Sequence, residues 1–467
     1  MAKRKKYIIE NLLIEKYAAE GKCLSKHEDK IVFVEGGVVP GDIVNVQVTK
    51  SKKDWAEAYP IDFIAYSNLR QEPQCEHFGI CGGCKWQMLP YSLQLEYKEQ
   101  QVKDQFKRIG HIDVEEYLPI KGCVNTYNYR NKLEFTFSNK QFLTKQQMEA
   151  NLPFEKNVLG FHAPKFFDKV IDIFHCHLQS EPSNEIKNFI RDYALQNNYT
   201  FYDIKSHQGL LRNLIIRVAS TNQILVNVIF AENDKEKISA LLQAIQNHFP
   251  QITSLNYTIN TKLNDTIYDL DVQLFYGKKY IEENLEKYTF IISPKSFFQT
   301  NPIQTVELYN VVKSFATCKG DEVLYDLYCG TGSIGIFLSD NVNKIIGVES
   351  VEDAITDARL NAKRNLLENT FFYTGDVLKI CNNDFFIKHG SPDIIVIDPP
   401  RAGCHSQLLE KLLEIKCKKI IYVSCNPATQ ARDLQILKSS YRIVKSQAVD
   451  MFPHTHHIEN VVLLQLN

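Results

Sequence analysis

A cysteine on a predicted tight turn is the residue of this sequence best placed to act as a nucleophile. Cys425 lies in Ser424-Cys425-Asn426-Pro427, after an apolar run at 419–423 that predicts a buried strand and before a helical pattern at 428–437. Asn and Pro favour a tight turn, and open α/β sheets place ligands at the carboxyl ends of their strands. A free cysteine can equally be a small buried hydrophobic residue. The assignment therefore depends on which residues share its surroundings.

A second group of cysteines has spacing suited to a metal or an iron–sulfur cluster. Cys75 is followed by Cys81-Gly82-Gly83-Cys84, where two glycines allow the backbone to fold tightly. A tetrahedral site needs a fourth thiolate, and Cys176 is the first candidate, with Cys123 as its rival. Spacing alone does not separate a [4Fe–4S] cluster from a four-cysteine zinc site. We expect the cluster and keep zinc as the alternative.

A glycine-containing loop predicts a nucleoside site in the C-terminal part of the chain. The strand pattern at 323–327 is followed by the loop 328–335, whose glycines allow a ligand to approach the backbone where a helix begins. Glu349 ends the next strand, about 20 residues on, where an acid can bind both ribose hydroxyls. Asp376 follows a third strand and can accept a hydrogen bond from an adenine amino group. A dinucleotide would fit this geometry as well.

The next strand favours a different cofactor. It covers 393–397 and ends in Asp398-Pro399-Pro400-Arg401, which resembles the fourth motif of S-adenosylmethionine-dependent methyltransferases. Methylases of amino groups usually carry an aromatic residue directly after the two prolines, where Arg401 stands here. Arg401 therefore points away from an exocyclic nitrogen as methyl acceptor, and a cysteine on the following strand points toward carbon.

The last motif combines histidines with a carboxylate. His454, His456 and His457 precede Glu459 and the terminal strand at 460–466. The histidines lie on a loop between strands without a second group of ligands nearby, so we do not interpret them as a metal site. Glu459, at the edge of a strand, is better interpreted as a buried carboxylate available for proton transfer.

Composition limits the class of protein. A chain of 467 residues with net charge −1 is long enough for two or three domains, and nucleic acid would have to bind local basic patches. Twelve cysteines do not indicate a disulfide scaffold in so long a chain. The N-terminus is no signal peptide, and the longest apolar runs, such as 224–231, have strand length. We expect a cytoplasmic protein that does not enter a membrane.

The N-terminal 66 residues predict a small barrel. Short strands at 7–9, 30–34, 43–49 and 56–63 are typical of a five-stranded, oligonucleotide-binding fold. Three lysines and an aromatic residue lie around a predicted hairpin tip, where they could contact phosphates and stack on a base; they are Lys50, Lys52, Lys53 and Trp55. The alternative is a solvated loop with a tryptophan that caps the barrel.

The middle of the chain predicts a mixed α and β structure. A helix is expected at 91–109, with Lys98 among the cations that we assign to its solvated face. Strands then alternate with helices near 184–195 and 234–248. Four cations occupy strand positions of this region, where they could bind phosphates or simply solvate a sheet; they are Arg130, Lys132, Arg212 and Arg217.

Together these motifs resemble the RNA 5-methyluridine methyltransferases, most closely the ribosomal-RNA branch that carries a TRAM domain and a [4Fe–4S] cluster. DLYCGTG, DPPRAG, SCNP and HTHHIE carry the likeness, which covers nearly the whole chain. The resemblance implies an α/β plus β fold: an OB-like TRAM barrel at 1–67, a central α+β domain with the cluster at 68–292, and a Rossmann-like methyltransferase domain at 293–467.

The resemblance also implies roles for individual residues. Cys425 would add to carbon 6 of uracil, Glu459 would remove the proton from carbon 5, and Phe297 and Asp398 would contact the base. Positions that contact S-adenosylmethionine would be Gln299, Tyr328, Gly330, Gly332, Ser333, Glu349, Asp376 and Asp398. The cluster ligands would be Cys75, Cys81, Cys84 and Cys176. Ser333 and Met88 depart from the family pattern, which commonly has asparagine and histidine there.

The expected partner is RNA, with ribosomal RNA favoured over transfer RNA, and we expect a monomer. Two other functions remain open from the sequence: methylation of carbon 5 of cytidine, and RNA binding by a chaperone whose methylase half is vestigial. The radical methylthiotransferases also join a TRAM barrel to a cluster, but their cysteines are spaced CxxxCxxC, unlike those of this chain.

Overall fold

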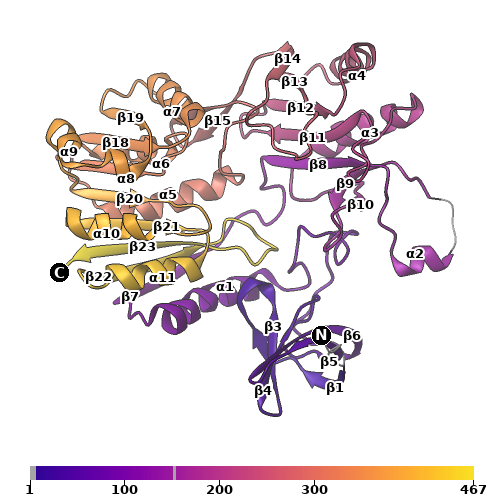
Figure 1. Ribbon diagram of the computed structural model, residues 1–467, viewed down its shortest axis with the longest axis horizontal. Coiled ribbons are helices and arrows are strands. Elements are labelled where there is room, and N and C mark those ends of the chain that lie inside the picture. Colours follow the sequence, from indigo (N-terminus) through magenta and orange to yellow (C-terminus); the bar gives the residue numbers. More distant parts are fainter. Residues whose placement is uncertain (1–6, 151–153) are drawn as a thin grey trace.

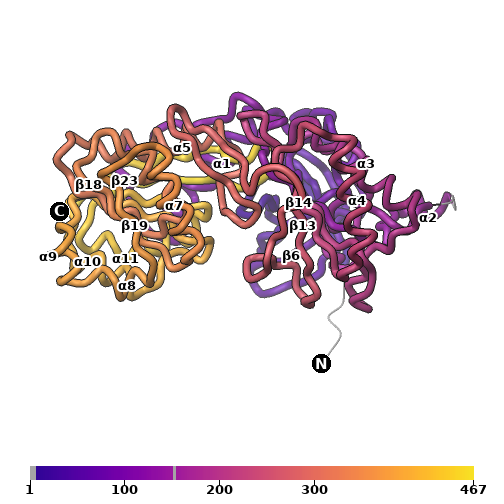
Figure 2. Tube along the Cα trace, turned by 90° about the horizontal axis from the view of Figure 1, so that it is seen from above, coloured from indigo at the N-terminus to yellow at the C-terminus, as the bar shows by residue number. Residues whose placement is uncertain are grey.

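The computed structural model describes residues 7–150 and 154–467 of the chain. In the view of Figure 1, an N-terminal sheet lies at the bottom, a C-terminal sheet at the left and a central sheet at the upper right. Seen from above in Figure 2, the central and C-terminal parts form two lobes that lie side by side.

The N-terminal sheet is built from strands whose buried positions alternate along the chain. Within the described residues it has six strands in the order β1-β5-β6-β4-β3-β2, instead of the five predicted. The valines at 44, 46 and 48 point into its core while their neighbours face outward. The strands are β1 (Ile8–Leu13), β2 (Lys16–Tyr17), β3 (Cys23–His27), β4 (Lys30–Val34), β5 (Ile43–Ser51) and β6 (Trp55–Ala65).

The central sheet packs against two amphipathic helices. In the described part of the chain its order is β10-β9-β8-β11-β12-β13-β14. Ile186 and Ile190 of α3 and Leu241 of α4 bury against it. The strands are β8 (Lys132–Ser138), β9 (Val158–His162), β10 (Val170–Asp172), β11 (Leu211–Val218), β12 (Ile224–Phe230), β13 (Ser254–Ile259) and β14 (Val272–Gly277). The helices are α2 (Lys145–Ala150), α3 (Ser183–Gln196) and α4 (Lys235–His248), of which the last two confirm the predicted helices.

The C-terminal sheet has the order β19-β18-β17-β20-β21-β23-β22-β7 in the described residues. β17 to β21 are parallel, and β23 runs antiparallel to β21 and β22. The strands are β7 (Glu116–Lys121), β17 (Val323–Leu327), β18 (Lys344–Glu349), β19 (Thr370–Thr374), β20 (Ile394–Ile397), β21 (Lys419–Ser424), β22 (Tyr441–Val449) and β23 (Glu459–Leu466).

Helices cover both faces of this sheet, which explains its nearly continuous apolar strands. One apolar core includes α5 (Pro302–Ala316), α6 (Ser333–Leu338) and α7 (Glu352–Arg364). The other includes α1, α8, α10 and α11. The remaining helices are α1 (Tyr91–Gln105), α8 (Val377–Ile380), α9 (Asn383–His389), α10 (Ser406–Ile415) and α11 (Pro427–Leu437). A hairpin of β15 (Ile281–Leu285) and β16 (Tyr288–Ile292) precedes α5.

One charge prediction for α1 is wrong. Lys98 does not lie on a solvated face: its side chain is fully buried, and its Nζ lies 2.6 Å from Oδ1 of Asp450. The buried pair joins α1 to the loop between β22 and β23. A charge can be buried when an opposite charge compensates it, and the partner lies more than 350 positions away in the sequence. No helix in the described residues is long and apolar enough to cross a membrane.

Candidate active site

Five predicted site residues meet at one edge of the C-terminal sheet. Tyr328 follows β17, Glu349 ends β18, Asp398 follows β20 and Cys425 follows β21. Because these strands are parallel, their carboxyl ends share an edge, and β17 and β20 are neighbours where the strand order reverses. Glu459 begins the antiparallel strand β23 at the same edge.

The turn that carries Cys425 is held by its neighbours. Asn426 caps α11, because its Oδ1 accepts a hydrogen bond from the backbone N–H of Ala428 (3.1 Å). Its Nδ2 donates to the carbonyl oxygen of Arg401 (3.2 Å). Proline at the first turn of the helix needs no N–H partner. The predicted strand, turn and helix are thus confirmed, and the turn is tied to the segment after Asp398.

The electrostatics of this edge are dominated by buried acids. Burial and the nearby carboxylates of Glu459 and Asp398 raise the pKa of the Cys425 thiol to about 11, while Arg401 opposes the shift. Burial raises the pKa of Asp398 to about 7. Burial and the charge of Asp398 raise the pKa of Glu459 well above its usual range. The structure therefore brings together a protonated thiol and two carboxyl groups that bind protons more tightly than usual.

The glycine loop has an open side where a ligand can lie. Gly330 and Gly332 have φ of 53° and 76°, and Tyr328 adopts the same left-handed region with φ of 64°, which is rare outside glycine and common at functional sites. A Cβ on Gly330 would meet no atom within 4 Å. Glu349 faces this loop, since its Oε2 accepts from the N–H of Gly330 (3.4 Å). The donor set and the open backbone fit a nucleoside cofactor.

Two other predicted cofactor contacts are partly engaged within the protein. One carboxylate oxygen of Asp376 caps α8 by accepting from the N–H of Leu378 (3.0 Å). The hydroxyl of Ser333 lies 2.6 Å from that of Tyr309. Tyr309 and Asp326 also lie at this site, although the sequence alone predicts a role for neither of them. Asp326 is fully buried, its Oδ1 has no partner, and burial raises its pKa to about 7 with contributions from Asp398 and Glu349.

The segment at 293–301 is anchored to the central sheet at two points. Arg217 of β11 donates to the carbonyl oxygen of Ser296 (2.7 Å), and Asn131 donates its backbone N–H to Thr300 (2.7 Å). Between these anchors Phe297 exposes 67% of its surface. An exposed aromatic ring on an anchored segment is suited to stacking on a base. Arg217 is itself buried, so it neither binds phosphate at the surface nor solvates the sheet.

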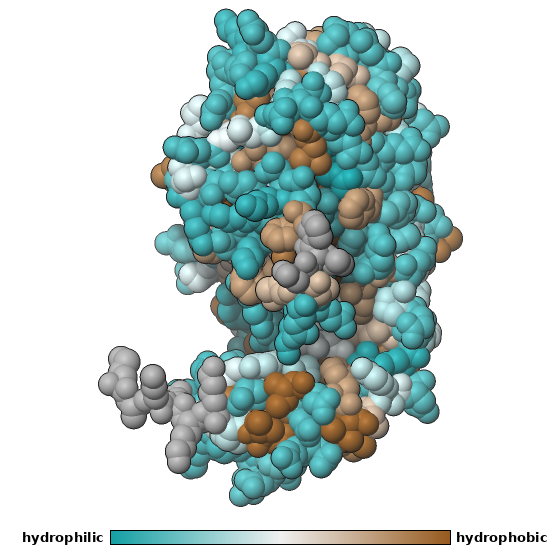
Figure 3. All heavy atoms as spheres, turned by 90° about the vertical axis from the view of Figure 1, so that its right-hand side faces the viewer, coloured by the Kyte–Doolittle hydropathy of each residue, from teal (hydrophilic) through white to brown (hydrophobic). Residues whose placement is uncertain are grey.

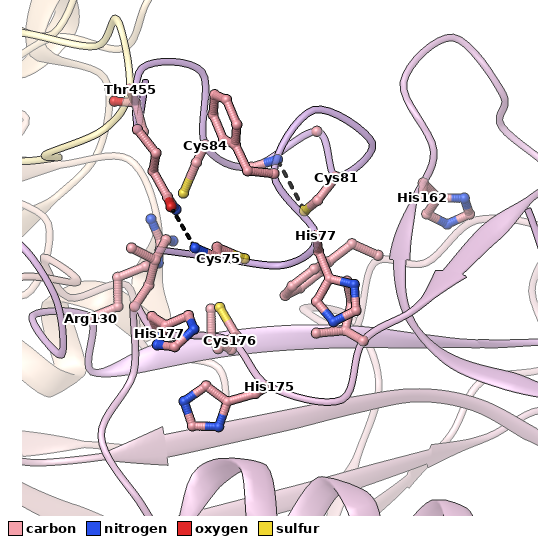
Figure 4. Close-up of a pocket in the computed structure, with 18 of the residues that line it drawn as sticks. Cys75, His77, Cys81, Cys84, Arg130, His162, His175, Cys176, His177 and Thr455 are labelled. Atoms are coloured by element: carbon pink, nitrogen blue, oxygen red, sulfur yellow. Dashed lines mark hydrogen bonds between the residues drawn. The ribbon is translucent and has the colours of Figure 1, made fainter. Parts of the chain in front are cut away.

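The four predicted cysteine ligands line one cavity of about 440 Å³. In the close-up of Figure 4, Cys75, Cys81, Cys84 and Cys176 lie around this cavity. Burial and the neighbouring cysteines raise the pKa of Cys84 to about 12. The rival Cys123 does not line the cavity; its thiol donates to the carbonyl oxygen of Asp450 instead (2.9 Å).

The four cysteines share a cavity, but their side chains are not arranged as metal ligands. Across 7–150 and 154–467, no group of three or more His, Cys, Asp or Glu side chains is arranged to hold a metal ion. Four soft thiols around one cavity, with the N–H of Gly83 donating to the sulfur of Cys81 (3.4 Å), are the donor set that an iron–sulfur cluster needs. The residues therefore fit such a group by their chemistry.

The histidines before Glu459 are packing residues. His454 is 3% exposed, its ring lies against Tyr127 with centroids 4.4 Å apart, and burial lowers its pKa to about 4. Burial also lowers the pKa of His457 to about 4, with a contribution from His456. Neutral imidazoles packed in this way support a loop.

The fold and the site define a class of protein, an S-adenosylmethionine-dependent methyltransferase with an added N-terminal β domain. A TRAM domain model matches residues 9–61. The structure resembles the tRNA (uracil-54, C5)-methyltransferase of Pyrococcus abyssi, solved with S-adenosyl-L-homocysteine, with a TM-score of 0.75 and 28% identity over 97% of this chain and all of that one.

The family follows from the sequence comparisons. The model of tRNA (uracil-5-)-methyltransferases matches residues 207–467, more than half of the chain. RNA methyltransferases without an assigned substrate from Bacteroides thetaiotaomicron and Porphyromonas gingivalis are each 49% identical over 96% of this chain, and this chain covers 100% and 98% of them. The chain therefore belongs to the RNA uracil-5 methyltransferase family with a TRAM domain. It is an S-adenosylmethionine-dependent RNA (uracil-5-)-methyltransferase.

Proposed function

We propose that this enzyme methylates carbon 5 of a uridine in 23S ribosomal RNA through a covalent adduct between Cys425 and carbon 6 of the uracil. The observation that carries the proposal is the meeting of Cys425, Glu459 and Asp398 at one edge of the sheet. Carbon 5 of uracil is too weak a nucleophile to take a methyl group unaided. Addition of a thiolate at carbon 6 turns the ring into an enolate and makes carbon 5 nucleophilic.

The first step needs a proton acceptor. The raised pKa of about 11 keeps the Cys425 thiol protonated near neutral pH, so the proton must leave as sulfur attacks. A buried carboxylate whose pKa is about 7, that of Asp398, is ionised in part at this pH and basic enough to accept it. Arg401 lies close enough to lower the pKa of the thiol and favours negative charge on sulfur as it attacks.

The last step needs a base that removes the proton from carbon 5. After carbon 5 has taken the methyl group, it still carries its proton. Glu459 removes that proton, the C5–C6 double bond forms again, and the C6–S bond breaks with its electron pair returning to the sulfur of Cys425. Burial raises the pKa of Glu459, which makes its carboxylate a stronger base than a solvated one.

The cofactor supplies a methyl group activated by its sulfonium. We propose that Gln299, Tyr328, Gly330, Gly332, Ser333, Glu349, Asp376 and Asp398 surround it. Glu349 would bind ribose hydroxyls, because its carboxylate already faces the open loop at Gly330. Asp376 would accept from the adenine amino group with the carboxylate oxygen that does not cap α8. Phe297, largely exposed on its anchored segment, would stack on the target base.

A [4Fe–4S] cluster would be held by Cys75, Cys81, Cys84 and Cys176, which line one cavity (Figure 4). Methyl transfer from a sulfonium needs no electron, so the cluster would stabilise the fold around these loops. We therefore propose a structural role and derive no catalytic step from it. Zinc remains the alternative that metal analysis would identify.

The RNA would bind across three parts of the chain, a barrel at 1–67, a central domain at 68–292 and the catalytic domain at 293–467. On the barrel, the Nζ of Lys50 lies 4.8 Å from the ring centroid of Trp55, so a cation and a stacking face share the hairpin tip. The barrel also exposes Tyr59, Ile61 and Tyr66. Figure 3 shows apolar side chains at the surface of the lower part of the molecule, where Figure 1 shows the N-terminal sheet. A target base must leave its stack to reach Cys425. We expect the enzyme to act as a monomer in the cytoplasm.

Transfer RNA is the second candidate substrate. The likeness to the tRNA methyltransferase of Pyrococcus abyssi covers 97% of this chain and favours it. The four cysteines around one cavity favour the ribosomal substrate, because the resemblance to that branch includes them.

The test is nucleoside mapping of ribosomal and transfer RNA from cells with and without this protein. A 5-methyluridine lost from 23S ribosomal RNA in the deleted strain, and restored by purified enzyme with S-adenosylmethionine, is the expected result. Loss from transfer RNA would move the assignment to the second substrate. Appearance of 5-methylcytidine alone would end the uridine proposal.

A further inference from the structure

The loop that leads into Glu459 is held by parts of the chain far from it in sequence. We call residues 450–458 the base loop. Its backbone and side chains contact α1, the cysteine segment at 81–86 and the segment at 293–301. Glu459 follows this loop directly and pairs with Val449 of β22, so the contacts of the loop act together with strand pairing to place the carboxylate.

Gln94 of α1 makes the central contact. Its Oε1 accepts from the backbone N–H of His454 (2.8 Å), and its Nε2 lies 3.2 Å from Nδ1 of the same residue. The same Nε2 donates to the carbonyl oxygens of Trp86 (3.0 Å) and Leu89 (2.9 Å). Gln94 is completely buried, so water cannot replace these bonds. One side chain thus bonds both the base loop and the segment that follows Cys84.

The cysteine segment also bonds the base loop directly. The backbone N–H groups of Lys85 and Trp86 donate to the carbonyl oxygen of His454, at 2.7 and 3.0 Å. His454 adopts φ of 65°, a conformation that costs energy for any residue with a side chain and persists only when the surroundings impose it. The bonds from Gln94, Lys85 and Trp86 are those surroundings.

Three further bonds fix the start of the base loop. Asp450 accepts from Nζ of Lys98 (2.6 Å) and from the hydroxyl of Tyr91 (2.9 Å), both on α1. Asn301 donates to the carbonyl oxygen of Met451 (2.9 Å). The loop is therefore fixed at its start and at its middle, and only four residues separate His454 from the strand that Glu459 begins.

We propose that Gln94 is a positioning residue for Glu459: it joins the base loop to the cysteine segment and so sets the carboxylate that removes the proton from carbon 5. The inference rests on the proposed function. A base must lie within hydrogen-bond reach of the proton that it takes, and a displacement of about 1 Å can cost about 100-fold in rate.

The step that depends on Gln94 is the last one. Addition of Cys425 and methylation of carbon 5 do not need Glu459 to accept the carbon proton. Elimination does, because the C6–S bond breaks only as that proton leaves. Loss of Gln94 should therefore leave the enzyme bound covalently to methylated RNA. It should lower kcat and KM together and leave kcat/KM nearly unchanged, because elimination follows the irreversible methyl transfer.

The experiment is Gln94→Met, which keeps the length of the side chain and removes its hydrogen bonds. We expect kcat to fall about 10- to 100-fold, kcat/KM for RNA and S-adenosylmethionine to stay within about twofold, and a protein–RNA adduct to accumulate on denaturing gels. Gln100→Met is the matched control, because Gln100 lies exposed on the same helix, and it should behave as wild type. Normal turnover of a folded Gln94→Met enzyme without adduct would overturn the proposal.

Two more variants keep the test decisive. Gln94→Asn keeps the amide but is one methylene shorter, so it cannot bond the backbone of His454 and the carbonyl oxygens of Trp86 and Leu89 together, and it should accumulate the adduct as well. Normal turnover without adduct in a folded Gln94→Asn enzyme would reject the role of Gln94 even if Gln94→Met fails to fold. Glu459→Gln, measured in parallel, separates the positioning role of Gln94 from the role of Glu459 as base. An adduct with Glu459→Gln but not with Gln94→Met rejects only the positioning role. No adduct with either variant rejects Glu459 as the base.

Discussion

Cys425 and Glu459 flank one cross-strand pair of the C-terminal sheet. Ser424, the last residue of β21, pairs with Asn460 of β23. Cys425 follows Ser424 in the turn before α11, and Glu459 directly precedes Asn460. The charge of Glu459 accordingly raises the pKa of the Cys425 thiol. Strand pairing thus places a proposed nucleophile and a proposed base at the same edge of the sheet.

Replacement of the nucleophile should abolish turnover without loss of the cofactor. In Cys425→Ser a hydroxyl replaces the thiol, and a serine is far less acidic and less nucleophilic than a cysteine. We expect methyl transfer to fall below detection while S-adenosylmethionine still binds, measured by calorimetry. Cys318→Ser is the control, because Cys318 is also half-buried and lies between α5 and β17, away from the site. Normal turnover by Cys425→Ser would exclude Cys425 as nucleophile.

Replacement of the base should trap the adduct. Glu459→Gln keeps the size of the side chain but cannot accept the carbon 5 proton, so elimination should slow by about 10²- to 10⁴-fold. A band of protein joined to RNA should persist on denaturing gels, and mass spectrometry should find a methyl group on it. Glu410→Gln, at an exposed position of α10, should show no such band. Release of product at the wild-type rate would assign the proton to another group.

Much of the site could be predicted because it depends on local sequence. The strand before Cys425 and the helix after it follow from apolar spacing and from Asn426 and Pro427, and the structure confirms both. The same holds for the glycine loop between β17 and α6. Each of these elements is specified by residues within about ten positions of one another, where hydrophobic period and turn chemistry act directly.

Long-range pairings could not be predicted. β7, at 116–121, adds to the C-terminal sheet beside β22, although more than 300 residues separate their sequences. The lysine at position 98 looked like one of several surface cations of α1, but only its buried partner Asp450 explains its place. Gln94 gave no signal at all. A polar residue on a helix is normally solvated, and the groups it bonds are known only once the tertiary structure is known.

The formation of the adduct should depend on pH near neutrality. Burial raises the pKa of Asp398 to about 7, so at lower pH this carboxyl is protonated and cannot accept the thiol proton. The rate of adduct formation should therefore rise about tenfold per pH unit below 7 and level off above it. Rapid-quench measurement of a single turnover by the wild-type enzyme isolates this step, because replacement of Glu459 would change the charge next to Asp398. A rate that does not change between pH 5 and pH 8 would contradict the role of a buried carboxylate.

A second buried acid should affect stability instead of rate. Burial raises the pKa of Asp326 to about 7 from the 3.8 of a solvated aspartate, so between these pH values the folded state holds a proton that the unfolded state has lost. The contribution of Asp326 to the free energy of unfolding should therefore fall by up to about 1.4 kcal/mol per pH unit as the pH rises to 7. Asp326→Asn should flatten this part of the profile in urea unfolding at pH 5 and pH 7. Asp384→Asn, at an exposed position, should keep the wild-type slope.

The last prediction concerns the cysteine cavity and compares a cysteine that lines it with one that does not. Cys176 lines the cavity with Cys75, Cys81 and Cys84, whereas the thiol of Cys123 donates to Asp450 outside it. Protein purified without oxygen should be brown and contain iron and sulfide. Cys176→Ser should lose most of both, and Cys123→Ser should keep them.

Loss of the metal should also displace the base loop, because the backbone after Cys84 is hydrogen-bonded to His454. Oxidative removal of the cluster should therefore lower the melting temperature and leave adduct on RNA in the wild-type enzyme, as Gln94→Met does. Colourless protein with one zinc ion per chain would identify a zinc site instead of a cluster. The effect of the metal on the base loop would then be measured by removing zinc with a chelator. Metal-free protein with full turnover and unchanged melting temperature would show that the four thiols support the base loop without any ion.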